Sequence, residues 1–163
     1  MRRVNKRRKR EGKTDYLKRL KLLKSGSPRV VFRRTNRYII GQYVVSEEAQ
    51  DKTKIEVNSK DLLKYDWPKE NEGSLKSIPA SYLTGLLIGK KIIQKKLETP
   101  IVDFGMHRNI HKKRIYAFVN GLIDAGIKIK YKEGIFPEEE RIKGSHLKKN
   151  IPFDQIKNKI EKD

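Results

Sequence analysis

Cysteine is absent from the 163-residue chain, so the sequence offers no disulfide, no thiolate metal ligand and no thiol nucleophile. No stretch approaches the roughly 18 apolar residues that a membrane span requires. The basic N-terminus is not followed by the apolar segment of a secretory signal. These absences suit a protein of a reducing compartment and argue against a membrane protein.

Acidic residues are scarce at one end of the chain. The whole sequence has 40 Lys and Arg against 20 Asp and Glu, a net charge of +20. Residues 2–37 hold 16 basic and 2 acidic side chains, a net +14, whereas the 126 residues that follow carry only +6. The positive charge is therefore a patch, and a patch of this density indicates a polyanionic partner such as nucleic acid.

The segment 29–45, RVVFRRTNRYIIGQYVV, predicts a β-hairpin. Residues 30–32 and 38–45 are rich in the β-branched and aromatic residues that favour strands. The turn falls near Thr35 and Asn36, because Asn tolerates a left-handed backbone. Three arginines flank this turn, so the hairpin tip offers phosphate donors, a planar stacking surface and an amide on one projection.

The chain before the hairpin predicts two kinds of structure. Residues 1–13, MRRVNKRRKREGK, have almost nothing to bury and are expected to be disordered without a partner. Residues 14–24 predict a short basic amphipathic helix, with Tyr16, Leu20 and Leu23 on one face and Thr14 or Asp15 as its cap. Such a helix could lie on a membrane or on a calmodulin-like partner, but the tail ahead of it favours nucleic acid.

The remaining chain alternates between strand and helix patterns. Further strands are expected over 53–58, 101–104 and 127–131, and helices over 59–65, 77–97, 114–125, a turn after Pro137, and 151–163. The buried stripe predicted for the longest helix is Leu83, Leu86, Leu87, Ile93 and Leu97, with Gly85 and Gly89 permitting a close backbone approach.

The expected fold class is α/β: a mixed β-sheet, made of the hairpin and further strands, packed with helices, with a basic disordered N-terminal tail and a helical C-terminal extension. Three parts are expected: residues 1–28 as an RNA-binding tail and helix, 29–132 as the α/β core domain, and 133–163 as the helical extension.

Motifs for catalysis or cofactor binding are not convincing. The run from Gly85 to Gly89 has three residues between its glycines and lacks the Ser or Thr that a phosphate-binding loop needs after its Lys. His107 and His111 stand four apart, but no Glu or Cys accompanies them at ligand spacing. Asp103 is a lone carboxylate that we interpret as structural. The sequence therefore predicts no enzyme, no metal or other cofactor, and no small-molecule substrate.

Five blocks follow one another in order: KTDYLKRLKLLKSGSPRVVFRRTNRYIIGQYV, PASYLTGLLIGKK, VDFG, RIYAFVNGLIDAGI and FPEEERIKGSHL. Together they resemble the large-subunit ribosomal protein L eighteen family, and most closely its archaeal and eukaryotic branch, whose eukaryotic member is ribosomal protein L five. The resemblance covers about residues 10–148 in register. The stretch from Asn150 onward has no pattern of this family.

This resemblance implies a structural, cytoplasmic protein of the large ribosomal subunit that binds 5S rRNA in the central protuberance. It further implies contact with the large, 23S-type rRNA and with a neighbouring ribosomal protein of the L five family. The family's RNA contacts lie in the basic N-terminal segment and around the first strand pair. They map here onto Arg7, Arg8, Lys9, Arg10, Lys13, Thr14, Tyr16, Arg19, Arg33, Arg34, Asn36, Arg37 and Tyr38.

Three other classes of function remain open from the residues alone, one of them a basic protein of a membrane surface. A non-specific DNA- or RNA-compacting protein would use the same charge, although the sequence has no helix-turn-helix or zinc-finger spacing. An enzyme acting on nucleic acid would need clustered carboxylates and a divalent metal, and no such cluster is identifiable.

Overall fold

A computed structural model describes residues 4–48, 50–145, 147 and 151–163 of the chain. Within these residues one four-stranded sheet forms, in the order β3-β2-β1-β4. Its strands are β1 Arg29–Arg34, β2 Ile39–Glu47, β3 Gln50–Asn58 and β4 Ile101–Asp103. The first three strands pair antiparallel in sequence order, and β4 joins β1 in parallel. The mixed sheet expected from the sequence is thus confirmed.

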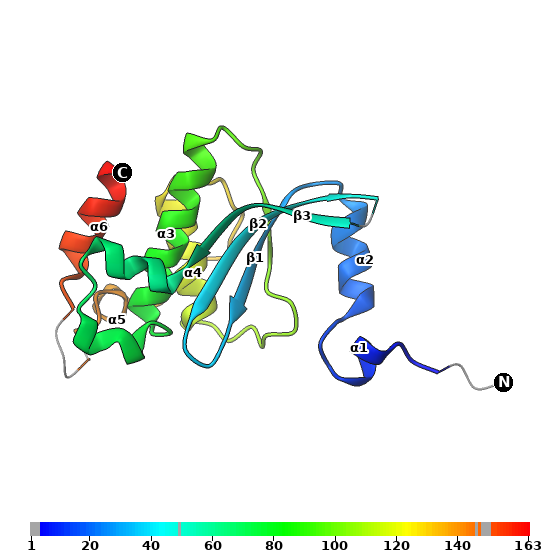
Figure 1. The fold of residues 1–163 in the computed structure, drawn as a ribbon, viewed down its shortest axis with the longest axis horizontal. Coiled ribbons are helices and arrows are strands. Elements are labelled where there is room, and N and C mark those ends of the chain that lie inside the picture. Colours follow the sequence, from blue (N-terminus) through cyan, green and yellow to red (C-terminus); the bar gives the residue numbers. More distant parts are fainter. Residues whose placement is uncertain (1–3, 49, 146, 148–150) are drawn as a thin grey trace.

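Helices lie on both sides of this sheet (Figure 1). They are α1 Arg7–Arg10, α2 Tyr16–Lys24, α3 Ile78–Gln94, α4 Arg114–Asp124, α5 Glu139–Lys143 and α6 Phe153–Lys162, with 3-10 helices η1 Ser59–Tyr65 and η2 Lys69–Ser74. Helices α3 and α4 cover one face of the sheet, and α5 and α6 lie beyond them. Helix α2 stands on the opposite side. No helix of the described residues has the length and hydrophobicity of a membrane span.

The core lies between the sheet and the α3–α4 pair. Val30, Phe32 and Tyr43 point into it and are at most 1% exposed, as the alternation of side chains along a strand requires. Phe32 packs on Phe118 of α4, with ring centroids 5.1 Å apart. Helix α6 packs on α3 and buries Phe153, Ile156 and Ile160.

Glycines allow α3 and α4 to approach at backbone distance. A Cβ on Gly85 would overlap the Phe118 carbonyl oxygen, and one on Gly121 would overlap the Tyr82 carbonyl oxygen. A Cβ on Gly89 would come within 2.5 Å of the Ala125 Cβ. The close approach predicted for Gly85 and Gly89 is therefore confirmed, with Gly121 as the matching residue on α4.

The buried stripe of α3 was predicted correctly only in part. Leu83, Leu86 and Leu87 are buried, but Ile93 is 45% exposed, and Ile92 is buried in its place. A single stripe describes a helix with one buried face. Because α3 contacts the sheet, α4 and α6, its burial extends around most of the helix and ends at the last turn.

The strand expected over 53–58 is present but irregular, and the strand expected over 127–131 is absent. A register shift between Tyr43 and Val44 pairs Ile55 with Tyr43 but Thr53 with Val44, so Thr53 leaves the face that Ile55 and Val57 share. Residues 127–131 form no strand. Ile127 is instead buried in the core, while Ile129 and the half-exposed Tyr131 line a groove of about 550 Å³ together with residues of β4.

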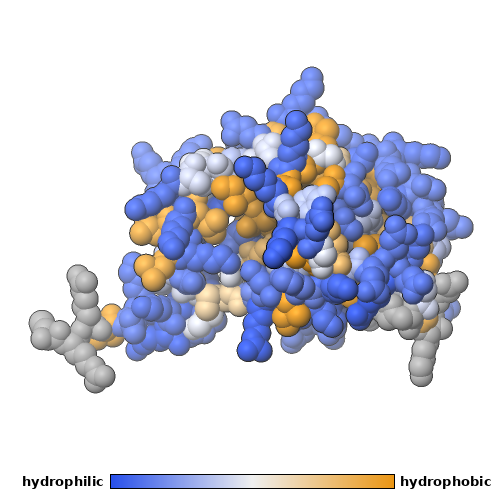
Figure 2. Space-filling model, turned by 180° about the vertical axis from the view of Figure 1, so that it is seen from behind, coloured by the Kyte–Doolittle hydropathy of each residue, from blue (hydrophilic) through white to orange (hydrophobic). Residues whose placement is uncertain are grey.

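Surface side chains are predominantly hydrophilic. In Figure 2 these residues, in blue, cover most of the face seen from behind, with smaller orange patches between them. Residues 1–3 of the basic tail lie outside the described residues, and in its described part α1 contains no buried residue. Residues 4–13, the described part of the tail, are exposed and contribute nothing to the core, as expected from the composition of the tail.

Candidate nucleic-acid interface

The hairpin tip is a short turn fixed by Thr35. The Thr35 backbone N–H donates to the Tyr38 carbonyl oxygen at 2.8 Å, and the Tyr38 N–H donates to Thr35 Oγ1 at 2.9 Å. Asn36 and Arg37 are exposed beyond these bonds, while Tyr38 packs partly against the core. The Lys76 ammonium donates to the Asn36 carbonyl oxygen at 2.8 Å. These bonds therefore fix the backbone from which the exposed Asn36 and Arg37 side chains project.

The arginines at the end of β1 point to opposite faces of the sheet, because consecutive side chains of a strand alternate. Arg33 reaches the face opposite α3 and α4, where its Nη2 lies 3.3 Å from Asp103 Oδ2. Arg34 is exposed on the other side. The prediction that the three arginines form one donor set at the tip is therefore wrong for Arg33 and Arg34, which belong to two different surfaces.

The face of the sheet opposite α3 and α4 contains a buried charge network. The Arg29 side chain is 3% exposed, donates to Ser46 Oγ at 2.8 Å and lies 2.7 Å from Asp51 Oδ1. Its other terminal nitrogen lies 3.7 Å from Asp103 Oδ2. Burial by itself raises the pKa of Asp51, but hydrogen bonds from Arg19 and Ser46 and the charges of Arg29 and Arg19 lower this pKa below its usual value.

Helix α2 is attached to this network by polar contacts. Asp15 caps its N-terminus by accepting the N–H groups of Leu17 and Lys18. Arg19 donates to Asp51 Oδ2 at 2.9 Å, and Lys18 donates to the Gly105 carbonyl oxygen at 3.1 Å. Leu17 and Leu20 are 74% and 51% exposed, whereas Leu22 and Leu23 are half-buried, so the apolar residues of the helix are only partly covered.

A groove of about 300 Å³ runs between α2, the tail and the sheet. It brings together five of the sequence-predicted residues: Arg8, Lys13, Thr14, Arg19 and Arg33. Thr53 also lines it, as a result of the register shift in β3. The groove therefore joins the predicted N-terminal residues to the end of the first strand.

Within the described part of the tail, the basic residues make local contacts or none. Arg7 and Lys13 pair with Glu11 at 3.7 and 2.8 Å, and Arg8 Nε donates to Thr14 Oγ1 at 2.9 Å. The Lys6 ammonium lies 4.8 Å from the centre of the Tyr16 ring. Lys9 and Arg10 are exposed on α1. These contacts are exposed and weak enough to be exchanged for phosphate.

A second basic surface was not predicted from the sequence. It lies where the loop after β4 meets the start of α4, and it comprises Arg34, His107, Arg108, Lys113, Arg114 and Arg141. Four Lys or Arg within residues 108–114 were the available signal. Arg141 could not be found in this way, because it is far along the chain and reaches the site only through the packing of α5 on α3.

The fold and these surfaces define an α/β protein with two sets of basic side chains on its surface. Residues 2–101 match the family described as ribosomal large subunit proteins 60S L5 and 50S L18. The chain is 44% identical over 146 residues, 90% of its length, to the large ribosomal subunit protein uL18 of Methanoculleus marisnigri, covering 81% of that protein.

Other archaeal relatives give the same result. The large ribosomal subunit protein uL18 of Korarchaeum cryptofilum is 45% identical over 141 residues, which are 86% of this chain and 70% of that protein. The protein of the same name from Methanoregula boonei is 43% identical over 86% of this chain and 79% of its own length. The chain therefore belongs to this family of large-subunit ribosomal proteins, as its five sequence blocks indicated. It is a structural ribosomal protein and not an enzyme.

Proposed function

We propose that the chain binds 5S rRNA and helps to anchor it to the 23S-type rRNA in the central protuberance, beside a ribosomal protein of the L five family, in cytoplasmic ribosomes. The observation that carries this proposal is the groove between α2 and the sheet, where Arg8, Lys13, Thr14, Arg19 and Arg33 meet. Cations from the tail, from a helix and from a strand converge there, and family membership makes ribosomal RNA the polyanion to expect.

Two parts of this interface have different roles in the proposal. The tail follows phosphates, because its side chains are exposed and its ion pairs are local. The hairpin tip supplies selectivity, because Asn36 and Arg37 are held by backbone hydrogen bonds in the turn. An amide and a guanidinium that project from a fixed turn suit unstacked bases and helix junctions of structured RNA.

The test is a binding titration of the whole chain against 5S rRNA, with tRNA and duplex DNA as competitors, at about 50 and 200 mM salt. Binding to 5S rRNA that persists against both competitors at the higher salt is the expected result. Equal binding to all three that disappears at the higher salt would overturn the proposal and identify a non-specific DNA- or RNA-compacting protein.

The substitution Arg37→Ala tests the hairpin tip in the same assay. It should reduce the preference for 5S rRNA over tRNA, since the tip provides the fixed donors. Lys60→Ala is the matched control, because it removes one exposed charge beyond β3 and should leave the preference unchanged. A uniform loss of affinity for both RNAs would mean that Arg37 acts only through its charge.

A further inference from the structure

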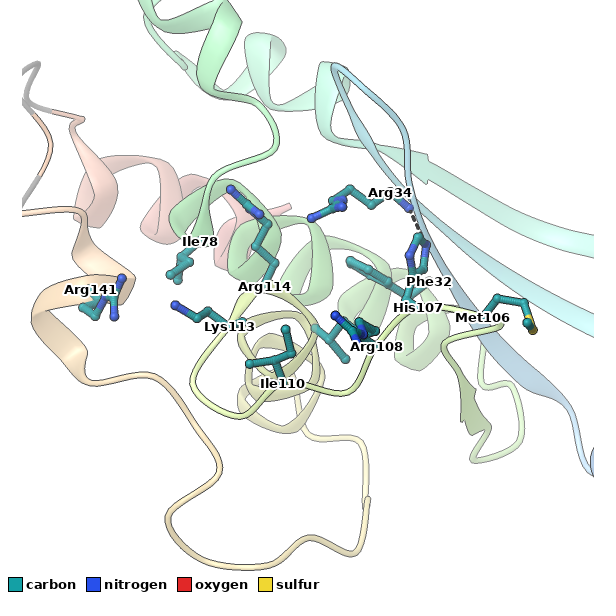
Figure 3. Close-up of a pocket in the computed structure, with 11 residues that line it drawn as sticks. Phe32, Arg34, Ile78, Met106, His107, Arg108, Ile110, Lys113, Arg114 and Arg141 are labelled. Atoms are coloured by element: carbon teal, nitrogen blue, oxygen red, sulfur yellow. Dashed lines mark hydrogen bonds between the residues drawn. The ribbon is translucent and has the colours of Figure 1, made fainter. Parts of the chain in front are cut away.

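The second basic surface is a pocket of about 570 Å³. Its cationic wall consists of Arg34 from the end of β1, Arg108 from the loop after β4, Lys113 and Arg114 at the start of α4, and Arg141 from α5. Figure 3 shows these side chains around one opening, with Arg34 and Arg114 extending toward the same region. Phe32 and Ile78 are among its apolar walls. We refer to it as the basic pocket.

The charges of the basic pocket are not neutralised by the protein. No acidic side chain lines it among the described residues. Within the same part of the chain, its five cationic side chains make no hydrogen bond or ion pair. On the other face of the sheet, by contrast, Arg29 and Arg33 both have carboxylate partners. Five like charges around one opening favour an anion.

Arg114 adds a donor that lacks an acceptor. Its Nε is buried and has no hydrogen-bond partner in the described structure, although a buried donor without an acceptor is costly. Burial and the nearby charge of Arg34 lower the pKa of Arg114. An anion in the basic pocket would supply the missing acceptor and relieve the repulsion between these two guanidinium groups.

The local backbone supports the same reading. Lys113 occupies the cap position of α4, and no side chain caps the helix, so its first N–H groups lack side-chain acceptors and carry the positive end of the dipole. Ser81 of α3 donates to the Arg114 carbonyl oxygen at 2.6 Å, which fixes this helix start. His107 accepts the Arg34 backbone N–H through Nε2 at 3.2 Å, which fixes the loop against β1.

We propose that the basic pocket binds the phosphate of an unstacked RNA nucleotide, with Arg114 and Arg34 as the inner donors and Arg108, Lys113 and Arg141 around the rim. This inference rests on the proposed function for the identity of the RNA. The volume of the basic pocket exceeds that of a phosphate group, and the apolar wall leaves space for the attached nucleoside. A nucleotide splayed out of an RNA helix therefore fits better than a stacked one.

The test uses the double variant Arg108→Gln/Arg141→Gln, whose two positions are exposed, so that folding is preserved. Lys128→Gln/Lys130→Gln removes the same charge from exposed positions beside β4 and serves as the control. The rim variant should bind 5S rRNA about tenfold more weakly than the control, as expected for the loss of a charge-assisted hydrogen bond. Its slope of log affinity against log salt should also be flatter by about one.

A phosphate-ethylation interference experiment locates the contact. Wild-type binding should be blocked by ethylation at a discrete phosphate that no longer affects the rim variant. The Arg114→Gln variant, once its thermal unfolding is shown to match that of the wild type, should also bind regardless of ethylation at this phosphate. If rim and control variants bind within twofold of one another and share one interference pattern, the inference is overturned.

The two proposals fail in different ways. If the wild-type chain does not prefer 5S rRNA over tRNA, the proposed function fails. The affinity of the rim variant divided by that of the control, measured for each RNA, still decides whether the basic pocket contributes to RNA binding. An acidic peptide that competes for the basic pocket while both variants bind RNA equally would assign it to a protein partner and overturn the inference.

Discussion

Arg29 is the most buried cation of the charge network on the face of the sheet opposite α3 and α4. Its 3% exposed side chain lies between Asp51 and Asp103. Arg29→Met would leave both carboxylates with one remaining cation each, Arg19 and Arg33. We expect it to lower the free energy of unfolding by about 3 kcal/mol, because the buried Asp103 carboxylate would then depend on the half-exposed Arg33 alone, and a buried carboxylate that loses a partner is strongly destabilising. Urea denaturation measures this loss.

Arg33→Met is the matched control for that prediction. It changes the same residue type on the same strand face, but the Arg33 side chain is 41% exposed, so water partly solvates its ion pair. The expected loss is below about 1 kcal/mol. Equal losses for the two variants would show that the burial of Arg29 does not decide the strength of the network.

His107 makes stability depend on pH. Burial, together with the charges of Arg33 and Arg34, lowers the pKa of His107, so the unfolded chain, with a His pKa of about 6.5, binds the proton more readily. Stability should therefore decrease as pH falls through about 6.5. His107→Gln keeps an acceptor for the Arg34 N–H but does not titrate. Its unfolding free energy should fall less than that of the wild type between about pH 7.5 and 5.5. Parallel pH profiles would contradict this account.

At the scale of elements, the contact between α3 and α4 depends on Gly121. Gly121→Ala would place a Cβ against the Tyr82 carbonyl oxygen, so the helices must separate. Although Ala normally stabilises a helix by about 1 kcal/mol over Gly, we expect a net destabilisation of about 1–3 kcal/mol from overpacking. The midpoint of chemical unfolding measures it. Gly73→Ala is the control, because nothing lies within 4 Å of its Cβ position.

Elements with a strong local signal were predicted well from the sequence. The hairpin follows from its β-branched residues, and α4 follows from its apolar stripe and from Gly126, which has a φ of +107° just after the helix. Local sequence patterns gave wrong predictions where contacts with distant parts of the chain determine the structure. Thr53 changes face because of a register shift, and residues 127–131 pack beside β4 without pairing.

The sequence predicted which residues of the candidate site are basic, but not which of them pair with carboxylates. Which cations remain available for a ligand depends on acidic partners distant in sequence. Arg33 pairs with Asp103 and so is not part of the hairpin tip. Asp51 pairs with both Arg19 and Arg29. The basic pocket combines Arg34 with Arg141, and no sequence pattern relates positions so far apart.

At the scale of the whole molecule, we expect the tail, residues 1–13, and the folded body, the rest of the chain, to contribute differently to RNA binding. No residue of α1 is buried, so deleting residues 1–13 should leave the thermal unfolding temperature unchanged. The deletion removes eight Lys or Arg and should weaken RNA binding. If about 6 to 10 phosphates are neutralised by the intact chain, its affinity falls about 10³- to 10⁵-fold between 50 and 200 mM salt, and the shortened chain should show a flatter dependence. An unchanged slope would remove the tail from the interface.

A scrambled tail separates charge from sequence. Shuffling residues 2–13 keeps every charge but destroys the pairs of Arg7 and Lys13 with Glu11. Because counterion release depends on the number of neutralised phosphates and not on their order, the scrambled chain should retain the salt slope of the wild type. It should also retain the preference for 5S rRNA over tRNA, since the folded body supplies the fixed donors. A scrambled chain that keeps its affinity but loses this preference would place recognition in the tail, and the hairpin tip would then be a positioning element alone.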